Sequence, residues 1–477
     1  MSDYKTISAT QIADDVREGR GSAVDFTSKA LKLAATEGRE LNAFITLCEE
    51  KALRQAAAID QMSPELRAKL PLAGVPIALK DNISYTDYPM TCGSHILDGY
   101  IPPFDATVVT RLIEAGAVII GKTNMDEFAM GSSNENSYFG PVKNPVDRSR
   151  APGGSSGGSA AVVAQGIVPL SLGSETGGSV RQPAAFCGLF GLKPTYGAVS
   201  RFGLTAFASS TDQISPFARS AEDLALLYRV VAGWDENDST SVAYDHPDYA
   251  SVLELDRKLK IGLPKEYFAE GIDADVAATI DRARQALESA GHTISDVSLP
   301  LTNKAIPTYY VIASAEASAN LARFDGVRYG LRESNDRSLE AMYSDTRESG
   351  FGPEVKRRIM LGTYALSSGY YDAYYNKASQ VRELMRQEFE QSFKSVDLLL
   401  SPTSPTPAFK LGEKIDDPLA MYLSDVYTAP ASLAGVPAIS IPYGESSDGL
   451  PIGVQCIAAS FGESLLFQIA NHLVPRA

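Results

Sequence analysis

The spacing of apolar residues along the first part of the chain predicts helices and buried strands in alternation. Residues 8–62 carry apolar positions in helical register and begin with SATQ, a possible capping box. Residues 72–83 (LAGVPIALKDNI) contain a continuous apolar run, which predicts a buried strand that ends at Lys80. Residues 105–124 (DATVVTRLIEAGAVIIGKTN) predict a helix, a glycine turn and a second strand.

The alternation continues through the rest of the chain. Residues 220–233 predict a helix capped by Ser220, and residues 273–300 predict a helix followed by a strand. We interpret the polar segment 234–257 as a surface excursion and not a linker, because a strand resumes directly after it. Further buried strands are predicted at residues 258–264, 395–402 and 435–442. Strands that alternate with helices in this way predict one α/β domain around a large sheet.

Composition and charge narrow the classes of partner. The 477 residues are 44% hydrophobic and 21% charged, which is typical of a folded globular protein. The formal net charge of −15 disfavours direct binding of a phosphate backbone, which requires clustered cations. The N-terminal residues lack a basic start and an apolar run, and no apolar stretch reaches the roughly 20 residues that span a bilayer. We therefore expect a cytoplasmic protein that has no membrane segment and leaves nucleic acid to a partner.

Two patterns that would indicate a bound metal or nucleotide are weak. The four cysteines, Cys48, Cys92, Cys187 and Cys456, are far apart and form no C-x-x-C pair, so neither a zinc site nor a disulfide framework is expected. Residues 116–123 (GAVIIGKT) fit the phosphate-binding pattern G-x-x-x-x-G-K-[ST]. In that motif a strand precedes the loop and a helix follows it, whereas here a helix precedes a strand-forming run. We interpret the segment as a core strand with Lys122 at its exposed end, and we expect no metal or cofactor in this chain.

A glycine-rich stretch at residues 152–159 (PGGSSGGS) raises the possibility of a nucleophilic serine. It includes GGSSG, which fits the G-x-S-x-G elbow of α/β-hydrolases. That machinery needs a catalytic histidine, and the four candidates lie in unpromising settings: His95, His246 in a polar loop, His292 in a helix-to-strand turn and His472 near the end of the last helix. Ser-His-Asp chemistry is therefore weakly supported.

A second serine-bearing glycine turn follows at residues 173–179 (GSETGGS). Ser155 and Ser179 can converge if one strand or helix returns the chain, and Gly177 and Gly178 allow backbone N–H groups to point into a shared space. Lys80, at the end of its apolar strand, is the candidate base, because burial can lower the pKa of an amine until it is neutral. From these residues alone, a catalytic centre and an ordinary flexible turn both remain open.

Residues 151–203 (APGGSSGGSAAVVAQGIVPLSLGSETGGSVRQPAAFCGLFGLKPTYGAVSRFG) resemble the signature of the amidase signature family throughout their length. The upstream GVPIALKDNI resembles the lysine strand of that family. The resemblance implies a Ser–cis-Ser–Lys triad in which Ser179 is the nucleophile, Ser155 the proton carrier after a cis peptide bond with Gly154, and Lys80 the base. It also implies an oxyanion hole formed by Thr176, Gly177 and Gly178 with the amide of Ser179.

The fold implied by this resemblance agrees with the pattern of elements. We expect one large amidase-signature domain over residues 1–477, with a central mixed β-sheet covered by helices on both faces. A helical N-terminal segment, about residues 1–65, would pack on it, and the signature core would occupy about residues 72–215.

Within the family, the chain resembles the A subunits of glutamyl/aspartyl-tRNA amidotransferases over nearly its whole length. The segments that carry this likeness are residues 122–137, 320–330, 352–375 and 417–442. The resemblance implies a glutaminase that passes ammonia to a B subunit, which uses ATP and Mg²⁺ to amidate aminoacyl-tRNA, with a C subunit bracing the pair. It places Tyr309, Arg358 and Asp425 in the glutamine pocket. Arg358 would bind the α-carboxylate and Asp425 the α-ammonium group.

Two other functions remain open. A stand-alone amidase would use the same triad on other small amides. A catalytically idle scaffold is disfavoured by the intact Lys80, Ser155 and Ser179. The sequence does not distinguish Glu-tRNA from Asp-tRNA as acceptor, or glutamine from asparagine as donor.

Overall fold

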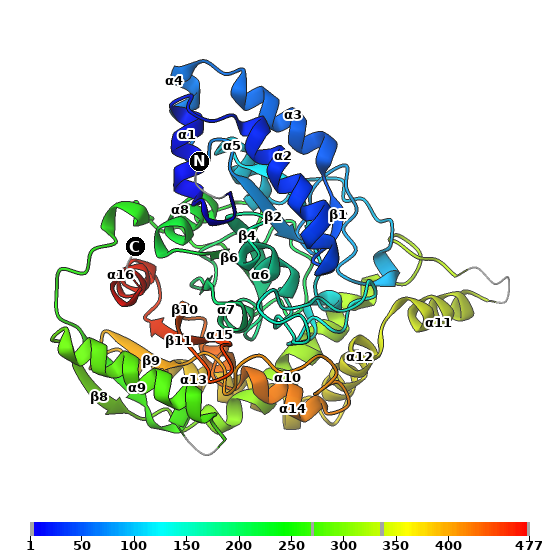
Figure 1. Cartoon of the computed structure of the whole chain (residues 1–477). Helices are drawn as coiled ribbons and strands as arrows, with labels where there is room; N and C mark the ends of the chain where they lie inside the picture. Colours follow the sequence, from blue (N-terminus) through cyan, green and yellow to red (C-terminus); the bar gives the residue numbers. More distant parts are fainter. Residues whose placement is uncertain (1–3, 269–270, 334–337, 475–477) are drawn as a thin grey trace.

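The computed structural model describes residues 4–268, 271–333 and 338–474. Within these ranges an 11-stranded sheet runs through the molecule (Figure 1) in the order β1-β3-β2-β4-β6-β5-β10-β11-β9-β7-β8. The strands are β1 Phe44–Leu47, β2 Pro76–Lys80, β3 Val118–Thr123, β4 Leu170–Glu175, β5 Phe190–Lys193, β6 Gln213–Ala218, β7 Lys260–Pro264, β8 Thr293–Val297, β9 Leu398–Pro402, β10 Ala438–Glu445 and β11 Pro451–Ala458. The sheet is mixed: β2 is parallel to β3 and β4, whereas β4 and β6 are antiparallel.

Helices flank the sheet and bury its central strands. Every residue of β2, β3, β4 and β6 is buried, as expected for strands covered on both faces. The helices are α1 Ala9–Arg17, α2 Ala23–Leu33, α3 Glu49–Asp60, α4 Pro64–Arg67, α5 Thr107–Glu114, α6 Gly157–Ala164, α7 Arg181–Cys187, α8 Ala221–Val231, α9 Ala274–Ser289, α10 Thr302–Asn320, α11 Leu339–Gly350, α12 Pro353–Leu366, α13 Lys377–Ser392, α14 Pro418–Tyr422, α15 Ala429–Ala434 and α16 Glu463–Leu473. Helix α16 packs against α8 and α9, α6 packs against α7, and α10 packs along α12.

This architecture confirms the predicted α/β fold with one mixed sheet flanked by helices. The predicted caps are also present, because the Ser8 and Ser220 side chains accept hydrogen bonds from the Gln11 and Asp223 amides at the starts of α1 and α8. Strand β1 was not predicted: it lies inside the segment expected to be helical and adds an antiparallel edge to β3. The division into an N-terminal segment and a signature core remains a prediction. None of the helices within the described ranges is long and apolar enough to cross a membrane.

The fold brings three strand ends to one edge of the sheet. Because β2 is parallel to both β3 and β4, the carboxyl ends of these strands lie side by side, at Lys80, Thr123 and Glu175. In open α/β sheets, ligands bind outside the carboxyl ends of parallel strands. Lys80 is the last residue of β2, and Ser155 and residues 176–179 lie in the segments that follow β3 and β4.

Candidate active site

Lys80 ends β2 and is completely buried, as the apolar run before it predicts. Its Nζ donates hydrogen bonds to Ser155 Oγ at 2.7 Å, to Ser156 Oγ at 2.8 Å and to the Ser174 carbonyl at 3.2 Å. Burial lowers the pKa of Lys80 to about 7, although the nearby carboxylates of Asp126 and Asp212 act in the opposite direction. A lysine with such a pKa can take up and return a proton near neutral pH.

The turn before α6 brings Ser155 to this amine. The peptide bond between Gly154 and Ser155 is cis, as the resemblance implies. The Ser155 carbonyl accepts a hydrogen bond from the Asp126 amide at 3.2 Å, and the Gly154 amide donates to Gln182 Oε1 at 3.0 Å. The next amide, that of Ser156, donates to the Ser179 carbonyl at 3.2 Å. The two glycine turns therefore lie side by side, an arrangement that the sequence allowed but left open.

The second turn, residues 176–179, follows the end of β4. The Thr176 hydroxyl donates to Asp212 Oδ1 at 2.7 Å, which fixes the first residue of the turn. Ser179 is 6% exposed, so its side chain lies at an almost buried position. A Cβ atom at Gly177 would lie 2.7 Å from Cζ of Tyr309, and one at Gly178 would lie 2.6 Å from Oδ1 of Asp425. Glycine is required at both positions, because the side chains of the candidate substrate pocket press directly against the turn.

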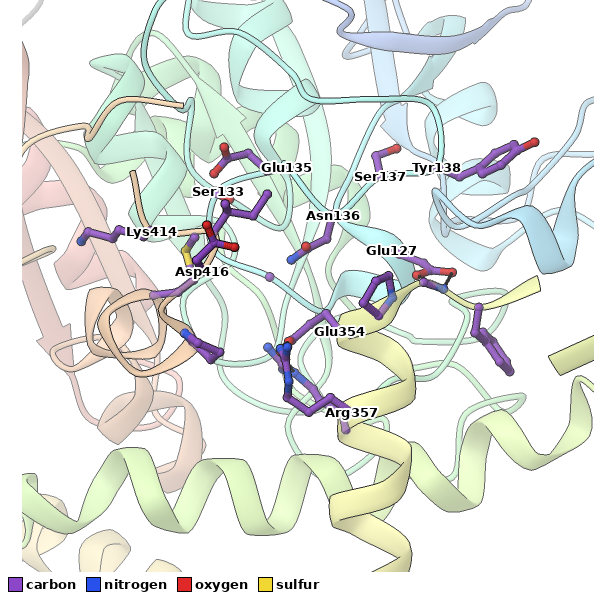
Figure 2. A pocket seen from close by; sticks show the side chains of 18 of the residues that line it. Glu127, Ser133, Glu135, Asn136, Ser137, Tyr138, Glu354, Arg357, Lys414 and Asp416 are labelled. Atoms are coloured by element: carbon purple, nitrogen blue, oxygen red, sulfur yellow. Dashed lines mark hydrogen bonds and ion pairs between the residues drawn. The ribbon is translucent and has the colours of Figure 1, made fainter. Parts of the chain in front are cut away.

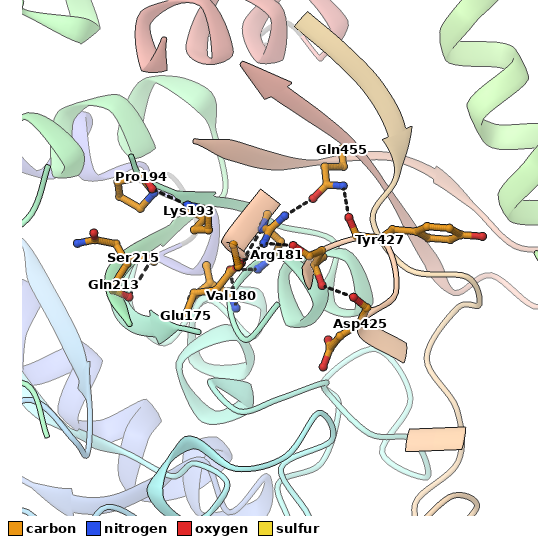
Figure 3. Close-up of polar contacts among 12 residues, drawn as sticks. Glu175, Val180, Arg181, Lys193, Pro194, Gln213, Ser215, Asp425, Tyr427 and Gln455 are labelled. Atoms are coloured by element: carbon orange, nitrogen blue, oxygen red, sulfur yellow. Dashed lines mark hydrogen bonds and ion pairs between the residues drawn. The ribbon is translucent and has the colours of Figure 1, made fainter. Parts of the chain in front are cut away.

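A buried ion pair between Glu175 and Arg181 lies on either side of this turn in the sequence and stabilises it (Figure 3). Glu175 accepts hydrogen bonds from the amides of Val180 and Arg181 at 3.0 and 2.9 Å, so one carboxylate closes the loop between β4 and α7. The Arg181 guanidinium also bonds the side chain of Gln455 and, at 2.8 Å, the Thr428 carbonyl. The turn of residues 176–179 is thereby tied to the segment that carries Asp425.

Asp425 offers a carboxylate oxygen to a ligand. Its Oδ2 accepts a hydrogen bond from Ser132 Oγ at 2.6 Å, whereas Oδ1 is buried and has no hydrogen-bond partner among the described residues. Burial raises the pKa of Asp425 to about 7, against the hydrogen bond from Ser132. An alkylammonium group at Oδ1 would supply the missing donor and stabilise the ionised form. Tyr309, on α10, is also buried beside the turn, and burial raises the pKa of its phenol.

Arg358 reaches the same region from α12 and is 2% exposed. Its Nε donates to Glu354 Oε1 at 2.8 Å, and its guanidinium lies over the rings of Tyr310 and Tyr422, 4.8 and 5.4 Å from their centroids. Burial opposes the charge, but the neighbouring tyrosines and the Glu354 carboxylate outweigh it and raise the pKa of Arg358. The arginine is therefore a fixed cation that can bind a carboxylate through its remaining N–H groups.

A cavity of about 540 Å³ opens onto this pocket. Figure 2 shows carboxylates and cations on its walls, among them Glu127, Glu135, Arg357 and Lys414. Its lining includes Glu354, Arg358 and Tyr422, together with Gly131 and Ser133 on either side of Ser132, and it does not include Lys80, Ser155 or Ser179. Of the three candidate recognition residues, Arg358 lines the cavity, whereas Tyr309 and Asp425, like the catalytic candidates, do not.

Within the described residues, no hydrogen bond joins any of the four histidines to Lys80, Ser155 or Ser179. His246 bonds the Tyr249 hydroxyl at 2.8 Å, and burial lowers its pKa to about 4. His292 accepts a hydrogen bond from the Leu259 amide and stacks edge-on against His472, and His95 stacks on Tyr138 in the cavity wall. Over the parts of the chain that the structure covers, no group of three or more His, Cys, Asp or Glu side chains is arranged to hold a metal ion.

A sequence model of the amidase family, described as "Amidase", matches residues 25–467. The chain belongs to the amidase family. Membership of this family explains why the sequence likeness extends over residues 151–203. The short G-x-S-x-G pattern covers only five of these residues.

Individual amidase relatives cover the chain almost completely. It is 55% identical over 473 residues to the A subunit of the glutamyl-tRNA(Gln) amidotransferase from Koribacter versatilis, and the match spans 99% of this chain and 98% of that protein. The crystal structure of the corresponding A subunit from the Thermotoga maritima glutamyl-tRNA(Gln) amidotransferase superposes with a TM-score of 0.81 at 42% identity, covering 99% and 95% of the two chains. A 6-aminohexanoate cyclic dimer hydrolase complexed with substrate gives a TM-score of 0.86 at 27% identity, covering 99% and 98%.

The structure corrects one sequence interpretation and adds residues that the motifs did not indicate. The prediction that GAVIIGKT forms a strand is confirmed by β3, but the prediction that Lys122 is exposed is wrong. Lys122 is fully buried, and its Nζ lies 3.2 Å from Oδ1 of Asp81, so an ion pair compensates the charge. Ser132 and Glu354 were not predicted as site residues. Both lie in segments that carry the family likeness, but only the fold shows that they contact Asp425 and Arg358.

Proposed function

We propose that this chain is the glutamine-hydrolysing subunit of a tRNA-dependent amidotransferase. In this function it releases ammonia from glutamine or asparagine, and a partner subunit uses the ammonia to convert Glu-tRNA(Gln) to Gln-tRNA(Gln), Asp-tRNA(Asn) to Asn-tRNA(Asn), or both. The observation that carries the proposal is the buried Lys80 amine bonded to Ser155, beside a glycine turn that presses against a free carboxylate oxygen of Asp425. The names of the relatives at 42–55% identity support the tRNA-dependent part.

The proposed chemistry begins with acyl transfer to Ser179. Its Oγ attacks the side-chain amide carbon while its proton passes through Ser155 to neutral Lys80. The resulting oxyanion is stabilised by the backbone N–H groups of residues 176–179. The proton returns from Lys80 through Ser155 to the leaving nitrogen, the C–N bond breaks, and ammonia and a glutamyl ester of Ser179 are formed.

Hydrolysis of the ester by water completes the cycle and uses the same groups. Lys80 takes a proton from water through Ser155, hydroxide adds to the ester carbon, and the Ser179–acyl bond breaks. Ser179 regains its proton and glutamate leaves. Each step needs Lys80 to be neutral when it accepts a proton, which its pKa of about 7 allows.

Substrate recognition in this proposal depends on two opposite charges. The α-ammonium group of glutamine binds the unpaired Oδ1 of Asp425, and the α-carboxylate binds the guanidinium of Arg358. Tyr309 closes the pocket against Gly177. Both charges are buried, so a substrate that lacks either group would leave the opposite charge unpaired.

The proposed partners are the B and C subunits, with which the chain would form a heterotrimer in the cytoplasm. The B subunit would use ATP and Mg²⁺ and would hold most of the aminoacyl-tRNA. The net charge of −15 supports this division of labour, because it disfavours binding of tRNA by this chain alone.

A stand-alone amidase is the second candidate function. The similarity to the 6-aminohexanoate cyclic dimer hydrolase favours it, because that protein shares the fold at a TM-score of 0.86 and is named for a different amide. Co-purification from the native cells distinguishes the two candidates, since an amidotransferase subunit should be isolated with its B and C partners.

The decisive experiment separates ammonia release from ammonia use. A complex reconstituted with Ser179→Ala should form Gln-tRNA or Asn-tRNA when supplied with ammonium chloride, and should form none from glutamine or asparagine. The wild-type complex should use both nitrogen sources. A Ser179→Ala complex that uses glutamine at the wild-type rate would show that ammonia comes from another site.

A further inference from the structure

We propose that Glu127 is a positioning residue that holds the first turn of α12 and thereby places Arg358 in the substrate pocket. The inference rests on the proposed recognition of an α-carboxylate by Arg358 and adds a residue to it. Glu127 lies in the short helical turn η4 Glu127–Ala129, far in sequence from α12. Figure 2 shows it at the upper end of the yellow helix that carries Glu354 and Arg357.

The contact between Glu127 and α12 is a helix cap supplied by another segment. Gly352 is the N-cap residue of α12, and its own amide is one of the N–H groups that the start of a helix leaves without an intrahelical partner. Both carboxylate oxygens of Glu127 accept from the Gly352 amide, Oε1 at 3.1 Å and Oε2 at 2.9 Å. Burial raises the pKa of Glu127 to about 7, and the Gly352 amide and the helix dipole act in the opposite direction, in favour of the ionised carboxylate.

Glu127 is itself fixed from several sides. It is 4% exposed, and Ser94 Oγ donates to its Oε1. The next residue, Phe128, packs against Phe351, with ring centroids 5.7 Å apart, immediately before Gly352. Phe128 has a φ of 48°, in the left-handed region where a bulky residue is unusual, so the packing holds this backbone against its local preference. The carboxylate therefore reaches α12 from a rigid support.

The preceding residue connects the same segment to the catalytic turns. Asp126 accepts hydrogen bonds from the amides of Asn134 and Asn136 at 2.9 and 3.0 Å, and its carboxylate fills the space beside Gly154. Two successive carboxylates thus point to different parts of the site. Asp126 supports the loop next to Ser155, and Glu127 supports the helix of Arg358.

A loosened first turn would affect Arg358 directly. Glu354, whose Oε1 bonds Arg358 Nε, lies two residues after Gly352 in that turn. Without Glu127, Glu354 keeps its bonds to Arg357, Arg358 and Tyr422, but the first turn that carries it is freer to move. The guanidinium of Arg358 is then held less firmly toward the α-carboxylate. Because the triad lies on other elements, the effect should fall on binding of the α-carboxylate and spare the chemical step.

The kinetic test uses two substrates and a matched control. Glu127→Ala should raise KM for glutamine about tenfold with little change in kcat, as expected for loss of one hydrogen bond to a charged group. It should leave KM unchanged for 4-aminobutanamide, which lacks the α-carboxylate. Glu127→Gln keeps an oxygen acceptor for Gly352 and should restore most of the affinity for glutamine. Glu340→Ala removes an exposed carboxylate from the first turn of another helix, α11, and should behave as wild type.

A double-mutant cycle and hydrogen exchange test the contact itself. A Cβ atom at Gly352 would collide with Oε2 of Glu127, so Gly352→Ala should displace the carboxylate and raise KM for glutamine as Glu127→Ala does. In the Glu127→Ala background the same methyl group finds space, so the second substitution should add little. Amide exchange at Gly352 and in the first turn of α12 should accelerate about tenfold or more in Glu127→Ala.

The outcomes separate this inference from the proposed function. Equal losses with glutamine and 4-aminobutanamide, or unchanged exchange in α12, would overturn the positioning role even if glutamine hydrolysis is confirmed. Failure of the wild-type complex to hydrolyse glutamine or asparagine would refute the proposed function. The exchange measurement would still decide whether Glu127 caps α12, and so would the double-mutant cycle if it is measured with another carboxylate-bearing amide that the chain binds.

Discussion

Replacing Lys80 by methionine should abolish amide hydrolysis and change the pH dependence of stability in a predictable direction. The pKa of Lys80 falls from 10.5 to about 7 on folding, because the amine is fully buried. Between these values the unfolded chain binds a proton that the folded protein releases, so wild-type stability rises with pH over this range. From the linkage relation, the burial cost is about 4 kcal/mol at pH 7.5 and about 1 kcal/mol at pH 10.

Methionine has a similar length and no charge, so it removes this cost together with three hydrogen bonds of about 1 kcal/mol each. Lys80→Met should therefore be more stable than wild type by about 1 kcal/mol at pH 7.5 and less stable by about 2 kcal/mol at pH 10. The change of about 3 kcal/mol between the two conditions is the firmer quantity, since contacts that do not titrate cancel in it.

Urea-induced unfolding of both proteins across this pH range measures the difference directly. Lys32→Met, at an exposed position on α2, provides the control, and its unfolding free energy relative to wild type should not vary over the same range. If the difference between Lys80→Met and wild type is also flat, Lys80 is charged in the folded protein at neutral pH. The assignment of Lys80 as the base would then be wrong.

Three further predictions concern the reaction. Ser179 should be acylated during turnover, so intact-mass analysis after a rapid acid quench should detect a glutamyl adduct in wild type and none in Ser179→Ala; an adduct that survives there and disappears in Ser155→Ala would reverse the two roles. Asp425→Ala should lower kcat/KM for glutamine and for 4-aminobutanamide by a factor equivalent to about 1.5–3 kcal/mol, and should leave kcat/KM unchanged for glutaramate, which lacks the α-ammonium group. Arg358→Ala should leave kcat/KM for 4-aminobutanamide unchanged. Equal losses on all three amides would place these residues outside the pocket. The kcat for glutamine should fall about tenfold per pH unit below about pH 7, where Lys80 becomes protonated, and a kcat that stays constant down to pH 5 would exclude it as the base.

The sequence predicted those parts of the fold and site that have a local cause. Lys80 could be placed at a buried strand end because five apolar residues precede it without interruption, and burial of that strand follows from the run itself. The sequence allowed the two serine turns to converge but left this open, because convergence required a strand or helix to return the chain between them. Strand β1 was missed because it has four half-buried residues, lies between helices and pairs only along one edge.

Other features depend on contacts between distant residues and have no local signal. Lys122 was predicted to be exposed because lysine is seldom fully buried without a partner, and its partner, Asp81, directly follows the neighbouring strand β2. Ser132 and Asp425 are 293 positions apart, and nothing in either segment indicates their hydrogen bond. The same is true of Glu127 and Gly352, which are 225 positions apart.

The order of the site residues along the chain has a consequence for how this enzyme could change its substrate. The proposed bond-breaking groups lie between residues 80 and 179 on one edge of the sheet, whereas the proposed recognition groups, Tyr309, Arg358 and Asp425, lie on α10, on α12 and in the turn before α15. Substitutions in the later half that keep the contacts with Gly177, Gly178 and Arg181 can reshape the pocket and leave the proposed proton path from Ser179 to Lys80 in place. A lineage could therefore acquire a new amide while its reaction chemistry stayed the same, and exchange of residues 300–430 between relatives should transfer preference for an amide along with the helices that carry it.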